Sequence, residues 1–230
     1  MLNVLLFLAS CALMVAFAWF SFKQGQSALT AWVVILSLSA NLFVLKQIQL
    51  FGLNATAGDV FAIGSLLALN LLQEKFGAQA AQQAIWTSFS CLLFFVIMSQ
   101  IHLWYLPSSY DESKSAYLFL LSPAPRIILA SLVTFLIVQQ CDLKLYGTFR
   151  KYFNRLSPLW ISAITMTISQ LLDTVLFALL GLYGMLSALT ELIITSYGIK
   201  LIAIASTIPW HYLSRKYFYT PSSPNTAAQS

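Results

Sequence analysis

Long apolar runs separated by short polar segments make up most of this chain. A helix needs about 20 mostly apolar residues to cross the hydrocarbon core of a membrane. Seven runs are close to that length: Val4–Phe22, Leu29–Leu45, Ala57–Gln73, Ala80–Trp104, Ser122–Gln140, Leu159–Gly181 and Met185–Ile208. They lack the polar–apolar alternation of membrane-barrel strands, so no strand is expected. The pattern predicts an all-α integral membrane protein, a bundle of six to seven transmembrane helices.

The composition excludes an ordinary soluble domain. Hydrophobic residues make up 59% of the 230 residues and charged residues only 8%, whereas a soluble domain carries about 25% charged residues. Residues 1–218 are expected to form a single transmembrane helical domain, and the polar tail at 219–230 is expected to be disordered. The first apolar run is interpreted as a helix and not as a signal peptide, because no positive side chain precedes it.

The positive residues lie in short polar segments and predict the orientation of the chain. The segment Asp142–Pro158, interpreted as a loop, carries Lys144, Arg150, Lys151 and Arg155. The loop Tyr105–Leu121 carries two acidic residues and only one lysine. Because cytoplasmic loops of membrane proteins are enriched in Lys and Arg, Asp142–Pro158 and the C-terminus are predicted to be cytoplasmic.

Most of the acidic residues lie inside or at the edges of the apolar runs. These residues are Asp59, Glu74, Asp142, Asp173 and Glu191. A charge at the centre of a transmembrane helix costs about 2.5–3.5 kcal/mol on insertion, so such residues commonly line a polar cavity. Two of them have an alternative, purely structural explanation. Asp59 is explained equally well as a residue at a helix N-terminus, and Asp142 as a residue at the level of the lipid headgroups. Asp173 and Lys200 lie well inside their runs and need a partner or a cavity.

Amide side chains accompany these carboxylates at helical spacing. Asn70, Gln73 and Glu74 share one helix face, and the spacing Gln-x-x-Asp occurs at both Gln139–Asp142 and Gln170–Asp173. A carboxylate accepts two N–H groups side by side, and an amide supplies both a donor and an acceptor. With aromatic residues available for stacking, this combination is suited to binding a planar nitrogen heterocycle.

The sequence contains no recognisable catalytic or metal-binding motif. The two histidines, His102 and His211, lie near predicted loops and in no metal-binding pattern. The three cysteines have no spacing typical of a metal site. An enzyme is therefore not expected, and a membrane-embedded enzyme is kept as an alternative of a different class. No cofactor, metal or directly bound nucleic acid is expected.

Several motifs occur in an order along the chain that indicates a family. They are Asn41-Leu-Phe-Val-Leu-Lys46; Asn70-Leu-Leu-Gln-Glu74-Lys-Phe-Gly77; Arg126 with Ala130-Ser131, Gln139 and Asp142; Ser169-Gln170-Leu-Leu-Asp173-Thr174 with Phe177; and Tyr197-x-x-Lys200 with Pro209. Together they resemble the motifs of the bacterial queuosine precursor transporters, a vitamin-uptake-like family. The chain departs from the family at Asn70, where an Asp is common, and at Val138, where a Ser is common.

The resemblance implies a transporter of the bacterial inner membrane that imports a 7-deazaguanine base or queuine for modification of transfer RNA. It also implies a helical core similar to that of the substrate-binding subunits of vitamin importers. The predicted substrate-binding residues are Asn41, Lys46, Asn70, Gln73, Glu74, Gln139, Asp142, Gln170, Asp173 and Lys200. Glu74 or Asp173 is expected to bind the guanine-like edge of the base. The alternative in the same class is a substrate-binding subunit for a vitamin that works with a separate ATP-driven module.

Overall fold

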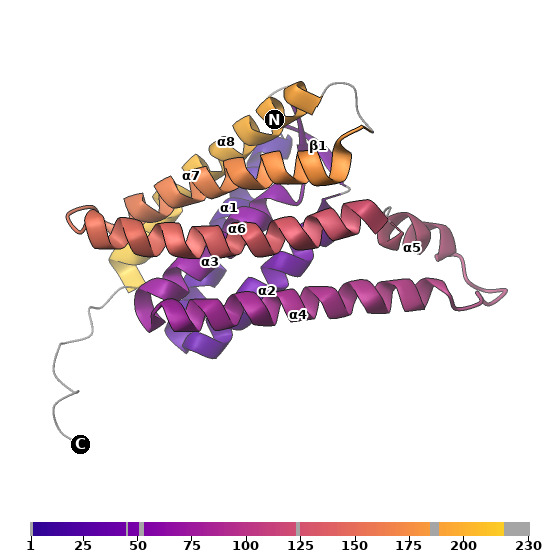
Figure 1. Ribbon diagram of the computed structural model, residues 1–230, viewed down its shortest axis with the longest axis horizontal. Helices are drawn as coiled ribbons and strands as arrows, with labels where there is room; N and C mark the ends of the chain where they lie inside the picture. Colours follow the sequence, from indigo (N-terminus) through magenta and orange to yellow (C-terminus); the bar gives the residue numbers. More distant parts are fainter. Residues whose placement is uncertain (1, 45, 51–52, 123–124, 185–188, 219–230) are drawn as a thin grey trace, which may run out of the picture.

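A computed structural model describes residues 2–44, 46–50, 53–122, 125–184 and 189–218 (Figure 1). Within these ranges the elements are α1 (Leu2–Gln24), α2 (Gln26–Phe43), β1 (Gln47–Leu50), β2 (Leu53–Thr56), α3 (Asp59–Phe76), α4 (Ala78–Leu103), α5 (Lys114–Leu121), α6 (Pro125–Tyr152), α7 (Pro158–Phe177), the π-helix η1 (Ala178–Leu182) and α8 (Leu189–Phe218). The predicted tail at 219–230 and the start of the last predicted run, at Met185, lie outside the described residues.

Six helices of the described chain are long and apolar enough to cross a membrane. They are α1, α2, α4, α6, α7 together with η1, and α8. Their surfaces expose large apolar side chains, and Leu5, Phe94 and Leu129 are 63%, 65% and 62% exposed. Extensive apolar exposure of this kind marks a surface that another apolar phase covers. The prediction of an all-α membrane bundle is confirmed, and the chain is a multi-pass membrane protein.

The third predicted run, Ala57–Gln73, is not among these six helices; it forms α3, the innermost helix of the bundle. It contacts α1, α2, α4, α6, α7 and α8, and every residue from 63 to 72 is buried. Its 18 residues include three charged ones, Asp59, Glu74 and Lys75. These charges are tolerated because neighbouring helices, and not lipid, surround most of α3.

Basic residues gather at one end of the bundle, which we call the basic end. They are Lys23, Lys75, Lys144, Arg150, Lys151 and Arg155. Lys75 Nζ donates a hydrogen bond of 2.6 Å to the backbone oxygen of Phe22, which joins the last turns of α1 and α3 there.

The turns into α2 and α4 use Gly25 and Gly77, whose φ angles of 115° and 88° favour glycine.

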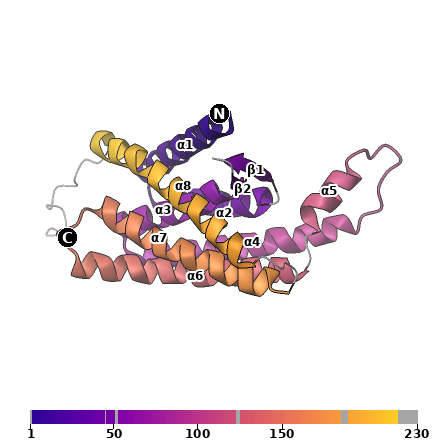
Figure 2. The ribbon, with the colours of Figure 1, turned by 90° about the horizontal axis from the view of Figure 1, so that it is seen from above.

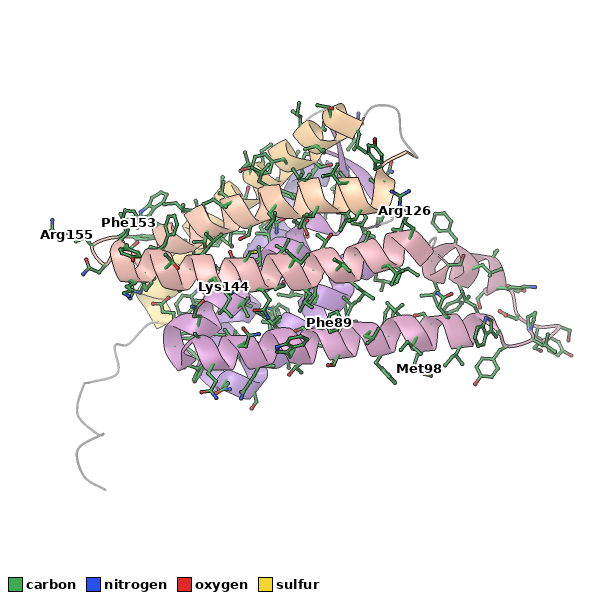
Figure 3. The ribbon with its side chains drawn as sticks, in the orientation of Figure 1. Phe89, Met98, Arg126, Lys144, Phe153 and Arg155 are labelled. Carbon is green, nitrogen blue, oxygen red and sulfur yellow. The ribbon has the colours of Figure 1, made fainter. Side chains whose placement is uncertain are left out.

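The opposite end, which we call the hairpin end, carries β1, β2, α5 and the start of α6 (Figure 2). Asn3 Nδ2 donates a hydrogen bond of 3.1 Å to the backbone oxygen of Gln49, so the first turn of α1 meets the hairpin. Figure 3 shows Lys144 and Arg155 toward one end of the bundle and Arg126 toward the other. The helices thus run between a basic end and a hairpin end.

Three predictions about the connecting segments are wrong. The segment between α2 and α3 forms an antiparallel hairpin, although no strand is predicted, because its backbone groups pair internally from Gln47–Thr56 to Leu50–Leu53. Most of Asp142–Pro158 is helical, because α6 continues to Tyr152 and presents basic side chains beyond its apolar stretch. The segment Tyr105–Leu121 includes the short helix α5. Hydropathy marks where lipid contact ends, whereas backbone hydrogen bonds decide where a helix ends.

Candidate functional site

A cavity of about 300 Å³ lies in the half of the bundle next to the hairpin end. Its walls come from the last turns of α2 and of α7, the first turns of α3 and of α8, the second half of α4 and the first half of α6. Small-molecule sites in proteins commonly have volumes of about 300–1,000 Å³. The cavity therefore has room for a small ligand such as a single heterocyclic base.

Three charged side chains line the cavity. Lys200 Nζ forms an ion pair with Asp173 Oδ2, which joins α8 to α7. Asp59 interacts electrostatically with both of these residues and accepts hydrogen bonds from Thr56. Lys200 is 6% exposed and Asp59 is 9% exposed, so protein atoms cover both. Among the described lining residues, two carboxylates therefore face one ammonium group.

Two buried glutamines line the cavity and carry unpartnered acceptor oxygens. Gln139 Nε2 donates a hydrogen bond of 2.7 Å to Ser65 Oγ, which joins α6 to α3. The Oε1 atoms of Gln139 and of Gln170 have no hydrogen-bond partner in the described part of the chain. Both glutamines line the cavity and are at most 3% exposed. A ligand that brings N–H donors would satisfy these oxygens.

The remaining wall combines small polar groups with aromatic rings. Asn41 accepts a hydrogen bond from the hydroxyl of Ser131, which fixes its amide against α6. Phe95, Phe135 and Phe177 also line the cavity, and they come from three different helices. Aromatic rings offer flat faces on which a planar ligand can stack.

A second polar cluster, which we call the Asp142 cluster, lies outside the cavity lining. Its members are Asn70, Asp142, Ser162, Thr165 and Ser169. Ser169 Oγ donates a hydrogen bond of 2.8 Å to Asp142 Oδ1, and Asn70 Nδ2 donates one of 3.0 Å to Ser162 Oγ. These bonds link α3, α6 and α7 through side chains, and all five members of the cluster are buried.

The structure brings half of the ten predicted site residues together in the cavity and places the other half elsewhere. The cavity is lined by Asn41, Gln139, Gln170, Asp173 and Lys200. Outside its lining, Asn70 and Asp142 belong to the Asp142 cluster, and Gln73 donates a hydrogen bond of 3.1 Å to the backbone oxygen of Leu143. Glu74 is half-buried in the last turns of α3, and Lys46 is exposed next to the hairpin.

Asp59 lines the cavity, although the sequence interpretation does not place it in the site. It is the first residue of α3, as its interpretation as a helix N-terminal residue requires. It precedes Asn70 by about three helical turns, so both lie on one face of α3. That spacing is the signal by which the sequence could have identified Asp59.

The chain is similar in sequence to known membrane transporters. Residues 56–214 match the family described as "Putative vitamin uptake transporter". A relative from Bacillus subtilis (strain 168), named "Probable queuosine precursor transporter", is 32% identical over 195 residues, which are 84% of this chain and 85% of the relative. No solved structure matches the chain. The chain therefore belongs to the vitamin-uptake-like family of membrane transporters, together with this queuosine precursor transporter of Bacillus subtilis.

Proposed function

We propose that this chain imports a 7-deazaguanine precursor of queuosine. The name of its Bacillus subtilis relative gives a queuosine precursor as the substrate of that protein. The main support from the chain itself is the cavity of about 300 Å³, whose lining includes Gln139 and Gln170, two residues with amide oxygens that have no donor in the described part of the chain. A buried acceptor without a donor costs about 1–3 kcal/mol. A ligand rich in N–H donors is therefore favoured there.

The guanine-like edge of these bases presents such donors. A ring N–H and an exocyclic amine lie side by side on that edge, and a carboxylate can accept both. Asp59 is the cavity carboxylate that is not ion-paired with Lys200. The amide oxygens of Gln139 and Gln170 can accept further N–H groups, and the three phenylalanine rings can stack on the base.

The charge of the cavity favours a particular kind of precursor. Among the described lining residues, Asp59 and Asp173 are two carboxyl groups and Lys200 is the single basic group. A ligand with a protonated amine would stabilise the ionised form of Asp59, the carboxyl group that is not ion-paired with Lys200. The aminomethyl base and queuine carry such an amine, whereas the nitrile base does not. The proposed substrates are therefore the aminomethyl base or queuine.

The test is an uptake assay with a readout in transfer RNA. The chain is expressed in cells that can neither make queuosine precursors nor import them, and each 7-deazaguanine compound is supplied separately. Queuosine is expected in transfer RNA when the aminomethyl base or queuine is supplied, and only in cells that contain the chain. The proposal is overturned if no compound restores queuosine while the protein is present in the membrane.

A matched pair of variants connects this assay to the cavity. Gln170→Leu removes an acceptor from the cavity wall and is expected to lower uptake about tenfold, which corresponds to about 1.4 kcal/mol. Gln83→Leu makes the same replacement at an exposed position of α4 and is expected to leave uptake unchanged. Equal uptake by the two variants would contradict a role of Gln170 in binding.

One further candidate is a substrate-binding subunit for a vitamin that works with a separate ATP-driven module; the description of the matched family supports only the vitamin-uptake part of this alternative. Transport by the purified chain alone in liposomes separates the two functions. An enzymatic function based on histidine has less support, because His102 is in the last turn of α4 at the hairpin end and His211 packs on Trp19 near the basic end. The two imidazoles cannot act on one substrate atom.

A further inference from the structure

Asp142 is a completely buried carboxylate that does not line the cavity. It is 0% exposed and lies within α6. Its carboxylate accepts a hydrogen bond of 2.8 Å from Ser169, and the other groups that act on it are the side chains of Asn70 and Thr165. All three neighbours are neutral, so none of them balances a negative charge on Asp142.

An ionised carboxylate in this position is costly. Transfer of a charged group from water into a protein interior costs several kcal/mol unless a partner of opposite charge accompanies it. Asn70 Oδ1 is also buried and has no donor in the described part of the chain. Among the described residues, the cluster therefore has neutral hydrogen-bond donors but no positively charged partner, and Asp142 Oδ2 and Asn70 Oδ1 remain acceptors without a donor.

A proton suits this cluster better than a metal ion. α6 is helical without a break at Asp142, and α7 is helical without a break from Ser162 to Ser169. Backbone carbonyls in unbroken helices are already hydrogen-bonded, whereas sodium sites in transporters use carbonyls that an unwound helix frees. A proton requires only one carboxylate oxygen and a nearby acceptor.

The position of Asp142 suits a proton that moves with the substrate. On α7, Asp173 lines the cavity, and Ser169, one turn away, contacts Asp142. Beyond Asp142, toward the basic end, Gln73 is hydrogen-bonded to the backbone oxygen of Leu143. Asp142 therefore lies between the substrate cavity and the basic end, at the junction of α3, α6 and α7.

We infer that Asp142 is the binding site of a coupling proton, separate from the substrate cavity. The carboxylate takes up one proton from the hairpin side while the cavity is loaded, and it releases this proton toward the basic end when α3, α6 and α7 separate there. The O–H bond of the carboxyl group is the bond that forms and breaks. The inference rests on the proposed transport function.

Other titratable side chains lie on the elements around Asp142. Tyr146 is one turn away on α6, Glu74 is one turn from Asn70 on α3, and Asp173 and Lys200 face the cavity from α7 and α8. Asp173 and Lys200 neutralise each other in their ion pair. If the dependence of transport on the proton gradient arose from any of these groups, it would persist when Asp142 is replaced.

The experiment uses the full-length chain in liposomes with labelled 7-aminomethyl-7-deazaguanine. Counterflow, the exchange of labelled for trapped unlabelled base, is measured without any gradient. Net uptake is then measured under an inward proton gradient and, separately, under an inward sodium gradient, with the membrane potential clamped at zero. For one coupled proton, a gradient of about one pH unit is expected to support about tenfold accumulation of the base.

Asp142→Asn is expected to keep counterflow within about twofold of the unmodified chain and to lose the tenfold accumulation. Asp111→Asn is the matched control, because Asp111 is an exposed carboxylate in the loop between α4 and α5. Hydrogen bonds from the hydroxyl and the backbone N–H of Ser113 lower the pKa of that carboxyl, so it is charged at neutral pH. This control is expected to keep both activities.

If Asp142→Asn does not fold, Ser169→Ala gives a milder test. It removes the hydroxyl that contacts Asp142 and leaves the carboxylate in place. Its proton-driven accumulation is expected to change while counterflow persists, and unchanged accumulation overturns the inference.

The outcomes separate the inference from the proposed function. Counterflow by the unmodified chain without any effect of the proton gradient overturns the inference and leaves the transport function intact. Proton-driven accumulation that survives in Asp142→Asn also overturns it, as does accumulation that follows sodium instead. Absence of counterflow by the unmodified chain overturns the proposed function, and the inference with it.

Discussion

Lys200 is the cavity residue that is most costly to bury, because its ammonium group lies away from water in a bundle that faces lipid. Asp173 offsets this cost through its ion pair with Lys200, which joins α7 to α8. Removing one partner of a buried pair leaves the other charge uncompensated, which costs more than removing both partners. The pair therefore contributes to folding as well as to the charge of the cavity.

Single and double replacements of this pair test both roles. Asp173→Asn or Lys200→Met alone is expected to destabilise the protein by about 2–3 kcal/mol, somewhat below the cost for a fully buried pair because the Asp173 side chain is 28% exposed. The double variant is expected to recover most of the thermal stability in detergent but not the uptake. Stability losses that simply add in the double variant would contradict a direct pairing energy.

The sequence predicted individual polar residues better than their grouping. Gln170 and Asp173 are polar positions in a long apolar run, and that contrast placed them in a site from sequence alone. The sequence could not predict that Gln139 lines the cavity while Asp142 lies outside it. Helical spacing shows that the two residues lie on one face of a helix, but not which element that face contacts. Gln139 contacts Ser65 at the cavity, whereas Asp142 contacts Ser169 behind it.

At the scale of elements, hydropathy predicted the helices and missed the hairpin. The alternation of Gln47, Ile48, Gln49 and Leu50 is a strand signal, but it spans four residues between two long apolar runs. The length of α6 was underestimated for a related reason, because Lys144 and Lys151 end the apolar pattern without ending the helix. Short polar segments carry too few residues for periodicity to identify their structure.

The contact between α2 and the start of α3 depends on a glycine. A Cβ atom at Gly58 would lie 2.7 Å from the backbone oxygen of Ala40 and 3.2 Å from the Cα atom of Val44. Because these are backbone atoms, the two helices would have to move apart. Asp59 follows Gly58 directly, so this close approach also sets the position of a cavity carboxylate.

Gly58→Ala is therefore expected to destabilise the protein by about 1–3 kcal/mol through overpacking and to weaken uptake. Gly198→Ala is the matched control, because a Cβ atom at Gly198 of α8 would meet no atom within 4 Å. It is expected to leave stability unchanged or to raise it by up to about 1 kcal/mol, since Ala favours helices more than Gly. The melting temperature in detergent compares the two, and an equal shift would contradict the packing argument.

At the scale of the whole molecule, the two ends of the bundle differ in the polar features that lie next to them. The cavity lies in the half next to the hairpin end, and the Asp142 cluster lies between the cavity and the basic end. The sequence predicted the bundle, but the cavity depends on contacts among helices far apart in the chain, which the pattern of residues along the chain does not specify. The distribution of charge nevertheless predicts which end faces the cytoplasm.

The orientation can be tested by labelling single cysteines with a membrane-impermeant maleimide. In a variant without Cys11, Cys91 and Cys141, Ser109→Cys places a thiol in the exposed loop at the hairpin end, and Asn154→Cys places one in the exposed loop at the basic end. Because Lys and Arg are retained on the cytoplasmic side, the first thiol is expected to react in intact bacterial spheroplasts and the second only after permeabilisation. The opposite pattern would place the hairpin end and the cavity in the cytoplasmic half and would contradict the predicted orientation.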